Sequence, residues 1–175
     1  RVPMAWAATQ NNLGSALRIL GGRESGTDRR KDSIMAYNSA LTVYTRERSP
    51  MDWAGLQNNL GNTFVMLGKR ENEAPLLEKA ISAYNASLSV RTRTGLPVDW
   101  AMTQNNLANA LMELGKLEDG TSRLREAVAA FTLAMEVFEE NNMSYRKKIA
   151  SRSLIRAQEL LELRQREQPE EPASR

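Results

Sequence analysis

Residues 50–67 read PMDWAGLQNNLGNTFVML, and two closely similar segments occur at residues 3–20 (PMAWAATQNNLGSALRIL) and 97–114 (PVDWAMTQNNLANALMEL). Equivalent positions are separated by 47 residues, as in Trp6, Trp53 and Trp100. A fixed period over most of a chain indicates a stack of similar units, each burying its apolar face against the next. We therefore expect three units at about residues 1–47, 48–94 and 95–141.

Each unit is predicted to form two helices. Pro50 suits the first helical turn, where its missing N–H is not needed, and apolar residues then recur at helical spacing. The tryptophans belong to this apolar stripe and are expected to lie in the core. Gly21, Gly68 and Gly115 are expected to end the first helices as left-handed caps. No segment alternates with period two, so the fold class is all-α.

The pattern changes after the third unit. Residues 144–167 are predicted to form one long helix without the tryptophan or the Gln-Asn-Asn motif. Repeat stacks need atypical terminal elements with a polar outer face, so this segment is predicted to be a C-terminal capping helix. Residues 1–168 would then form a single solenoid, followed by a flexible tail at 169–175.

Two motifs carry a family resemblance. Gln57-x-x-Leu60-Gly61 in the first helix and Ala80-x-x-x-Tyr84 in the second both recur in the other units. Over residues 3–141 the chain resembles the tetratricopeptide repeat, although that repeat is usually about 34 residues long. The longer unit is similar to the kinesin light chain type. The resemblance implies a right-handed α-solenoid of three helix-turn-helix repeats plus the cap, acting as a protein-interaction scaffold whose first helices line a concave groove.

Composition argues against catalysis. The chain contains no cysteine and no histidine, which removes the thiolate, the commonest general base and the commonest metal ligand. We therefore predict no enzymatic activity, no catalytic residue, no metal site and no cofactor. No apolar run approaches the roughly 20 residues that span a bilayer. No signal-peptide pattern is visible, so cytoplasmic localisation is expected, and the chain is expected to be part of a longer protein.

The candidate binding surface is the face of each first helix opposite the apolar stripe. An amide side chain both donates and accepts, so a row of amides suits the backbone of an extended peptide. We hypothesise that this face binds a peptide or a partner-protein segment, with Asn58 and Asn105 as central contacts. The predicted contact residues are Asn11, Asn12, Ser15, Arg18, Asn58, Asn59, Asn62, Asn105, Asn106 and Asn109.

Several alternatives stay open. The amides could instead bond one another across the seam between units. The leading face around Val2, Met4 and Trp6 could mediate self-association, and the chain could be a regulatory sensor module of a larger protein. The basic stretch at residues 146–166 is the one feature that suits nucleic acid, but such helices are more often solvated caps, so nucleic acid is not expected as a partner.

Overall fold

The computed structural model describes residues 2–24 and 26–167, and these residues form seven α-helices and no strand. The all-α prediction is therefore confirmed. The predicted tail at 169–175 lies outside the described residues. The helices are α1 (Val2–Arg23), α2 (Asp28–Leu41), α3 (Pro50–Glu71), α4 (Ala74–Leu88), α5 (Pro97–Leu117), α6 (Ser122–Glu140) and α7 (Ser144–Glu167).

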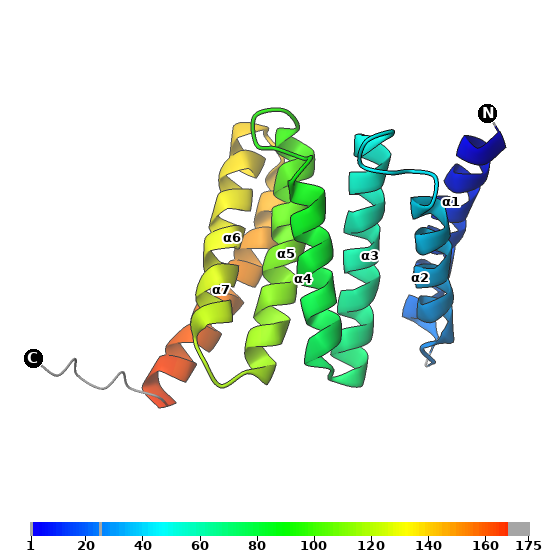
Figure 1. The fold of residues 1–175 in the computed structure, drawn as a ribbon. Helices are drawn as coiled ribbons and strands as arrows, with labels where there is room; N and C mark the ends of the chain where they lie inside the picture. The colour runs from blue at the N-terminus through cyan, green and yellow to red at the C-terminus, as the bar shows by residue number, and fades with distance from the viewer. Residues whose placement is uncertain (1, 25, 168–175) are drawn as a thin grey trace, which may run out of the picture.

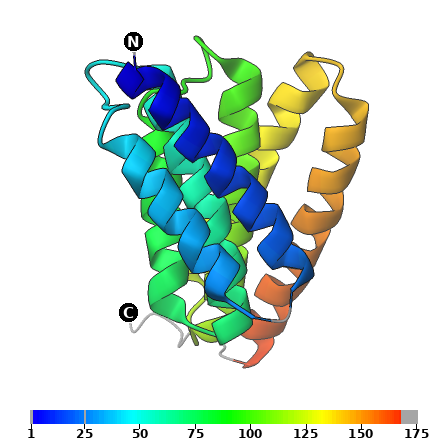
Figure 2. The same cartoon turned by 90° about the vertical axis from the view of Figure 1, so that its right-hand side faces the viewer.

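The helices pair as hairpins, α1 with α2, α3 with α4 and α5 with α6, and the hairpins stack from α1 at one end to α7 at the other (Figure 1). Figure 2 looks along the stack from the α1 end. Neighbouring odd-numbered helices come into close backbone contact, whereas in the described part of the chain the even-numbered helices do not. The stack therefore curves toward the row of odd-numbered helices.

An aromatic ring seated on a small residue holds each hairpin together. Tyr37 and Tyr84 are fully buried, and a Cβ added to Gly61 would lie only 2.5 Å from Cε1 of Tyr84. The same construction on Gly14 gives 2.7 Å to Tyr37. A glycine on the odd-numbered helix thus lets the ring of the even-numbered helix approach the backbone directly.

The predicted role of Gly21, Gly68 and Gly115 as left-handed caps is wrong. The odd-numbered helices continue past these glycines, and Asn72 is the residue with positive φ (56°) that ends α3. A Cβ on Gly68 would lie 2.9 Å from the side chain of Leu77 in α4. These glycines therefore serve close helix packing and not backbone reversal.

The prediction that the tryptophans lie in the core is wrong for Trp6, whereas Trp100 packs against the core cluster that contains Ala101 and Val137. Trp6 is 43% exposed, and Trp53 and Trp100 are half-buried. The guanidinium carbon of Arg46 lies 5.8 Å from the Trp53 ring centroid, and Arg93 lies at the same distance from Trp100. Each of these two indoles thus lies at the edge of a seam between units, where one face can meet a cation from the preceding turn.

Helix α7 occupies the place of a fourth odd-numbered helix. The N–H of Lys147 donates to the carbonyl of Met143, which repeats the bond from Trp100 to Leu96 at the start of α5. Ala150 is fully buried, like the equivalent Leu56 of α3 and Thr103 of α5. The segment predicted as a cap therefore keeps the register of the repeat, although its sequence motifs have changed.

Helix α7 lacks the small residues that admit a partner helix on the earlier odd-numbered helices. Positions equivalent to Gly61 and Gly68 carry Ile155 and Glu162, and Ile155 is 54% exposed. Side chains of this size would hold off a ring that needs direct contact with the backbone. A further hairpin helix therefore cannot pack on α7 as α4 packs on α3.

A matched pair of glycine substitutions tests this packing. We expect Gly61→Ala to lower the free energy of unfolding by about 1–3 kcal/mol, because the new methyl group collides with Tyr84. In the same helix, a Cβ at Gly55 would meet Arg91 at an ordinary 3.6 Å, so Gly55→Ala should be neutral or stabilise by up to about 1 kcal/mol. Urea denaturation followed by circular dichroism measures both, and equal effects would contradict this role for Gly61.

Candidate functional site

The paired asparagines of the odd-numbered helices form one polar ladder, which we call the amide face. Nδ2 of Asn59 donates to Oδ1 of Asn11 at 3.2 Å, and one seam later Nδ2 of Asn106 donates to Oδ1 of Asn58 at 3.1 Å. The cross-seam bonding that the sequence left open as an alternative therefore exists. The amide face consists of Asn11, Asn12, Asn58, Asn59, Asn105 and Asn106.

These bonds use only part of the capacity of each amide. An asparagine side chain has two donor hydrogens and a carbonyl with two lone pairs. Asn11 and Asn58 accept through Oδ1 and keep their NH₂ groups, whereas Asn59 and Asn106 donate once and keep their carbonyls. All four side chains are only half-buried. Each seam thus retains one amino group and one carbonyl that are held in place and can meet a ligand.

A second row of predicted contact residues is tied to the hairpin core. Oγ of Ser15 lies 3.1 Å from the hydroxyl of Tyr37, and the hydroxyl of Tyr84 donates to Oδ1 of Asn62 at 2.8 Å. Burial raises the pKa of Tyr84 well above its usual range, so the phenol stays neutral and remains a donor. Ser15 and Asn62 therefore serve as hydrogen-bond partners of the buried tyrosines.

The third unit lacks this bond because Phe131 stands where the other units have tyrosine. Nδ2 of Asn109 donates instead to the backbone carbonyl of Asn105 at 2.8 Å. The hydrogen-bond partner of the asparagine at this position therefore depends on whether the neighbouring aromatic residue carries a hydroxyl group.

Arg18 is partly withdrawn from the amide face. It is half-buried, its charge acts on Tyr84, and its Nε is buried with no hydrogen-bond partner in the described part of the chain. The equivalent positions carry Val65 and Met112, and Met112 is buried. This position therefore lies closer to the packing between hairpins than the asparagines do.

A cavity of about 300 Å³ opens on the amide face at the seam between the first two units. Asn11, Asn12 and Asn59 line it together with two charged residues that the sequence analysis did not select, Asp52 and Arg91. Nη1 of Arg91 donates to Oγ1 of Thr103 at 3.3 Å, which ties this arginine to the third unit. Arg91 could have been noticed in the sequence, because it is a charged residue at a position where the other two units carry the aromatic Tyr44 and Phe138.

A smaller cavity of about 110 Å³ lies at the equivalent place between α5 and α7. Its residues include Asn105, Asn106 and Arg146, which occupy the positions of Asn11, Asn12 and Asp52. The same hollow thus recurs two units later, with an acidic residue replaced by a basic one.

A second charged cluster joins the C-terminal turns of α3 and α5. Glu113 pairs with Lys69 at 3.0 Å and with Lys116 at 2.8 Å. Burial disfavours the ionised carboxylate, but the hydrogen bonds and charges of the two lysines outweigh it and lower the pKa of Glu113 below its ordinary value. Because α3 and α5 belong to different units, this triad stabilises the seam between them.

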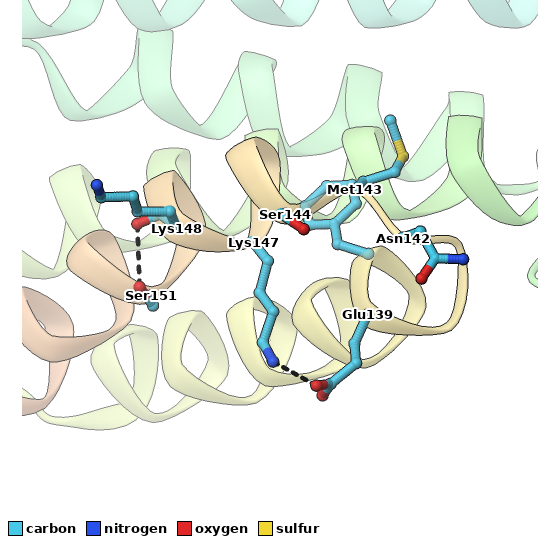
Figure 3. Close-up of a pocket in the computed structure, with 8 residues that line it drawn as sticks. Glu139, Asn142, Met143, Ser144, Lys147, Lys148 and Ser151 are labelled. Atoms are coloured by element: carbon cyan, nitrogen blue, oxygen red, sulfur yellow. Dashed lines mark hydrogen bonds and ion pairs between the residues drawn. The ribbon is translucent and has the colours of Figure 1, made fainter.

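The turn between α6 and α7 borders an open hollow of about 490 Å³ (Figure 3). Lys147 points to Glu139 and pairs with it at 2.5 Å, while Oγ of Ser151 donates to the carbonyl of Lys148 at 3.0 Å. Lys147 stands at the position of the tryptophans, so an ion pair takes the place of the arginine–indole contact at this last seam.

Among the described residues, no group of three or more aspartate or glutamate side chains is placed to hold a metal ion. No helix in this part of the chain is both long and apolar enough to cross a membrane.

A comparison with models of known protein families finds a match in the third hairpin. Residues 100–132 match the family model described as tetratricopeptide repeat, and this range covers most of α5 and the first half of α6. A comparison with curated proteins finds no match. Residues 100–132 are therefore similar to a tetratricopeptide repeat, and the all-helical stack around them has the architecture of a helical-repeat solenoid of that type. Repeats of this family generally mediate protein–protein interaction.

The ion triad predicts a pH-dependent stability. We expect Glu113→Gln to lower the free energy of unfolding by about 1 kcal/mol near neutral pH. The folded-state pKa of Glu113 lies below the ordinary value of 4.5. Its stabilisation is therefore complete above pH 4.5 and is lost as the pH falls through the folded-state pKa.

Urea denaturation of wild type and variant at a series of pH values measures this difference. Glu71→Gln, at an exposed position of α3, is the control and should show little effect at any pH. A difference between wild type and Glu113→Gln that grows on acidification would contradict the assignment.

Proposed function

We propose that this tetratricopeptide-repeat chain is a non-enzymatic interaction scaffold whose amide face binds an extended peptide or partner-protein segment. The observation that carries the proposal is the cross-seam pairing of the asparagines. Each pair keeps a free amino group beside a free carbonyl, which are the two groups needed to bond the C=O and the N–H of a peptide backbone.

The repeat spacing supports an extended ligand. Packed helices lie about 8–10 Å apart, and an extended chain advances about 3.3 Å per residue. Successive asparagine pairs would therefore meet about every third residue of a peptide that runs along the stack. The amides also hold one another in place before a ligand binds, so binding would cost less side-chain conformational entropy.

The cavity at the first seam would accept one ligand side chain. Asp52 and Arg91 both line it, so the cavity carries charge of both signs. A strongly acidic segment would meet Asp52 as well as Arg91, which favours a neutral or mixed-charge ligand.

Selection from a phage-displayed random peptide library tests the proposal, with the immobilised chain as bait. Peptides selected on wild type should bind Asn11→Ala/Asn58→Ala about tenfold to a hundredfold more weakly, because about two ligand hydrogen bonds are lost. Fluorescence anisotropy with the labelled peptides measures the affinities. The matched control is Asn38→Ala/Asn85→Ala, which removes two exposed amides from α2 and α4 and should leave the affinity unchanged.

Thermal melting followed by circular dichroism checks that both double variants remain folded. The proposal fails if no peptide is selected, or if the two folded double variants bind the selected peptides equally well.

A second candidate function is self-association through the leading face of α1. Trp6, Leu13 and Leu20 are 43%, 46% and 42% exposed, and Met4 is 44% exposed. By contrast Leu60, which is equivalent to Leu13, is buried in one cluster with Tyr37 of α2. The side chain of Val2 lies outside the described residues. The occupant that this face fits is therefore an apolar surface of the kind that α2 presents to α3.

Sedimentation velocity over a wide concentration range distinguishes this second candidate. Self-association through α1 predicts a concentration-dependent sedimentation coefficient that Leu13→Glu abolishes. Leu133→Glu is the control, because Leu133 is 37% exposed on α6, which makes no backbone contact with α1. A coefficient independent of concentration in the wild type would remove the candidate.

A further inference from the structure

The asparagine ladder ends in an unsatisfied acceptor. Oδ1 of Asn11 and Oδ1 of Asn58 each accept a bond from the following unit. Oδ1 of Asn105, at the same position, is buried and has no hydrogen-bond partner in the described part of the chain. The difference follows from the sequence, since α7 carries Ser153 where α3 and α5 carry the donating asparagine.

The side chain that carries this acceptor lines a cavity that can hold a ligand group. Asn105 lines the hollow of about 110 Å³ between α5 and α7, and a single water needs only about 10–15 Å³ of such space. Met102, Phe138 and Ile149 give the hollow apolar walls, and the exposed Arg146 supplies a cation. The corresponding residues at the two earlier seams are Asp52 and Asp99, so among the described seams only the one between α5 and α7 combines an unpaired acceptor with a positive charge.

The two polar groups define the chemistry that fits. Oδ1 of Asn105 requires a donor, and the guanidinium of Arg146 requires an acceptor. A carboxylate would pair with Arg146 but would set an oxygen against Oδ1, and an ammonium group would satisfy Oδ1 but would be repelled by Arg146. A carboxamide offers an amino group and a carbonyl in one plane, on an apolar stem that suits the walls.

The ladder itself supports the same choice. At the two earlier seams the partner of the equivalent Oδ1 is an asparagine amino group at 3.1–3.2 Å. A carboxamide from a ligand would supply that contact at the seam between α5 and α7, where Ser153 stands in place of the donating asparagine.

We propose that the cavity formed by Asn105, Arg146 and the apolar walls binds the side-chain carboxamide of an asparagine or glutamine in a partner peptide. This inference rests on the proposed function, because it assigns a side-chain preference to one end of the amide face. The carboxamide donates to Oδ1 of Asn105 and accepts from Arg146, which fixes the register of the peptide along the stack.

Titration followed by two-dimensional NMR tests the proposal, with N-acetyl-asparagine methylamide as the probe and its aspartate and leucine counterparts for comparison. The asparagine probe should shift the side-chain amide signal of Asn105 and saturate at a concentration at least about tenfold lower than either counterpart, since one hydrogen bond to a buried acceptor is worth about that factor. Arg146→Ala should weaken its binding about threefold to tenfold, without changing the fold of this exposed position.

Ser153→Asn provides an internal competitor. The new amide would donate to Asn105 as Asn106 donates to Asn58, so the variant should lose binding of the asparagine probe and gain thermal stability. Ser151→Asn, on another side of α7, is the matched control and should bind the probe as wild type does.

The outcomes separate this inference from the general function. Equal binding of the asparagine and leucine probes, or unchanged binding in Ser153→Asn, overturns the carboxamide site while leaving the effect of Asn11→Ala/Asn58→Ala on selected peptides intact. Loss of that effect overturns the amide-face function itself. Should Ser153→Asn fail to fold, the comparison of the three probes on wild type and Arg146→Ala decides the question alone.

Discussion

Direct contact between an aromatic ring and the backbone of the facing helix is the constraint on which the architecture depends. The rings of Tyr37 and Tyr84 lie so close to Gly14 and Gly61 that no side chain fits between them. This contact fixes the rotation of each odd-numbered helix against its partner. Because the ring fixes which face of the helix points inward, the opposite face, which carries the asparagines, points in the same direction in each unit. The amide ladder is therefore a consequence of hairpin packing.

The amides hold the stack together with some of their atoms and leave the others available to the proposed ligand. One acceptor and one donor per seam hold neighbouring units together, at Asn11–Asn59 and Asn58–Asn106, and the remaining groups stay half-buried at the surface. An amide can do both because it has more hydrogen-bonding capacity than one contact consumes. A structural role for these residues thus supports a binding role, since the cross-seam bonds hold the free groups in fixed positions.

The last seam differs from the others through substitutions on one helix. Helix α7 keeps the register of α3 and α5, yet it carries isoleucine for the close-contact glycine, serine for the donating asparagine and arginine for the aspartate. The first change puts the exposed Ile155 where α3 admits an aromatic ring. The other two leave Asn105 without its donor and place Arg146 at the same hollow. The loss of the close-packing glycine and a distinct polar hollow therefore arise in the same helix.

The sequence by itself determined the all-helical hairpin stack, because a 47-residue period and helical apolar spacing leave few other ways to bury the repeated residues. It also placed the asparagines on one side. It misassigned the glycines at positions 21, 68 and 115 and Trp6, since residue type does not reveal whether a glycine meets a turn or a ring, or whether an indole lies inside a seam or at its edge. Only the tertiary structure decided which amide bonds which, and that Arg91 and Asp52 share a cavity. These pairings join residues 39 positions apart in Asp52 and Arg91 and 48 apart in Asn11 and Asn59, and they depend on the rotation between units, which no local pattern encodes.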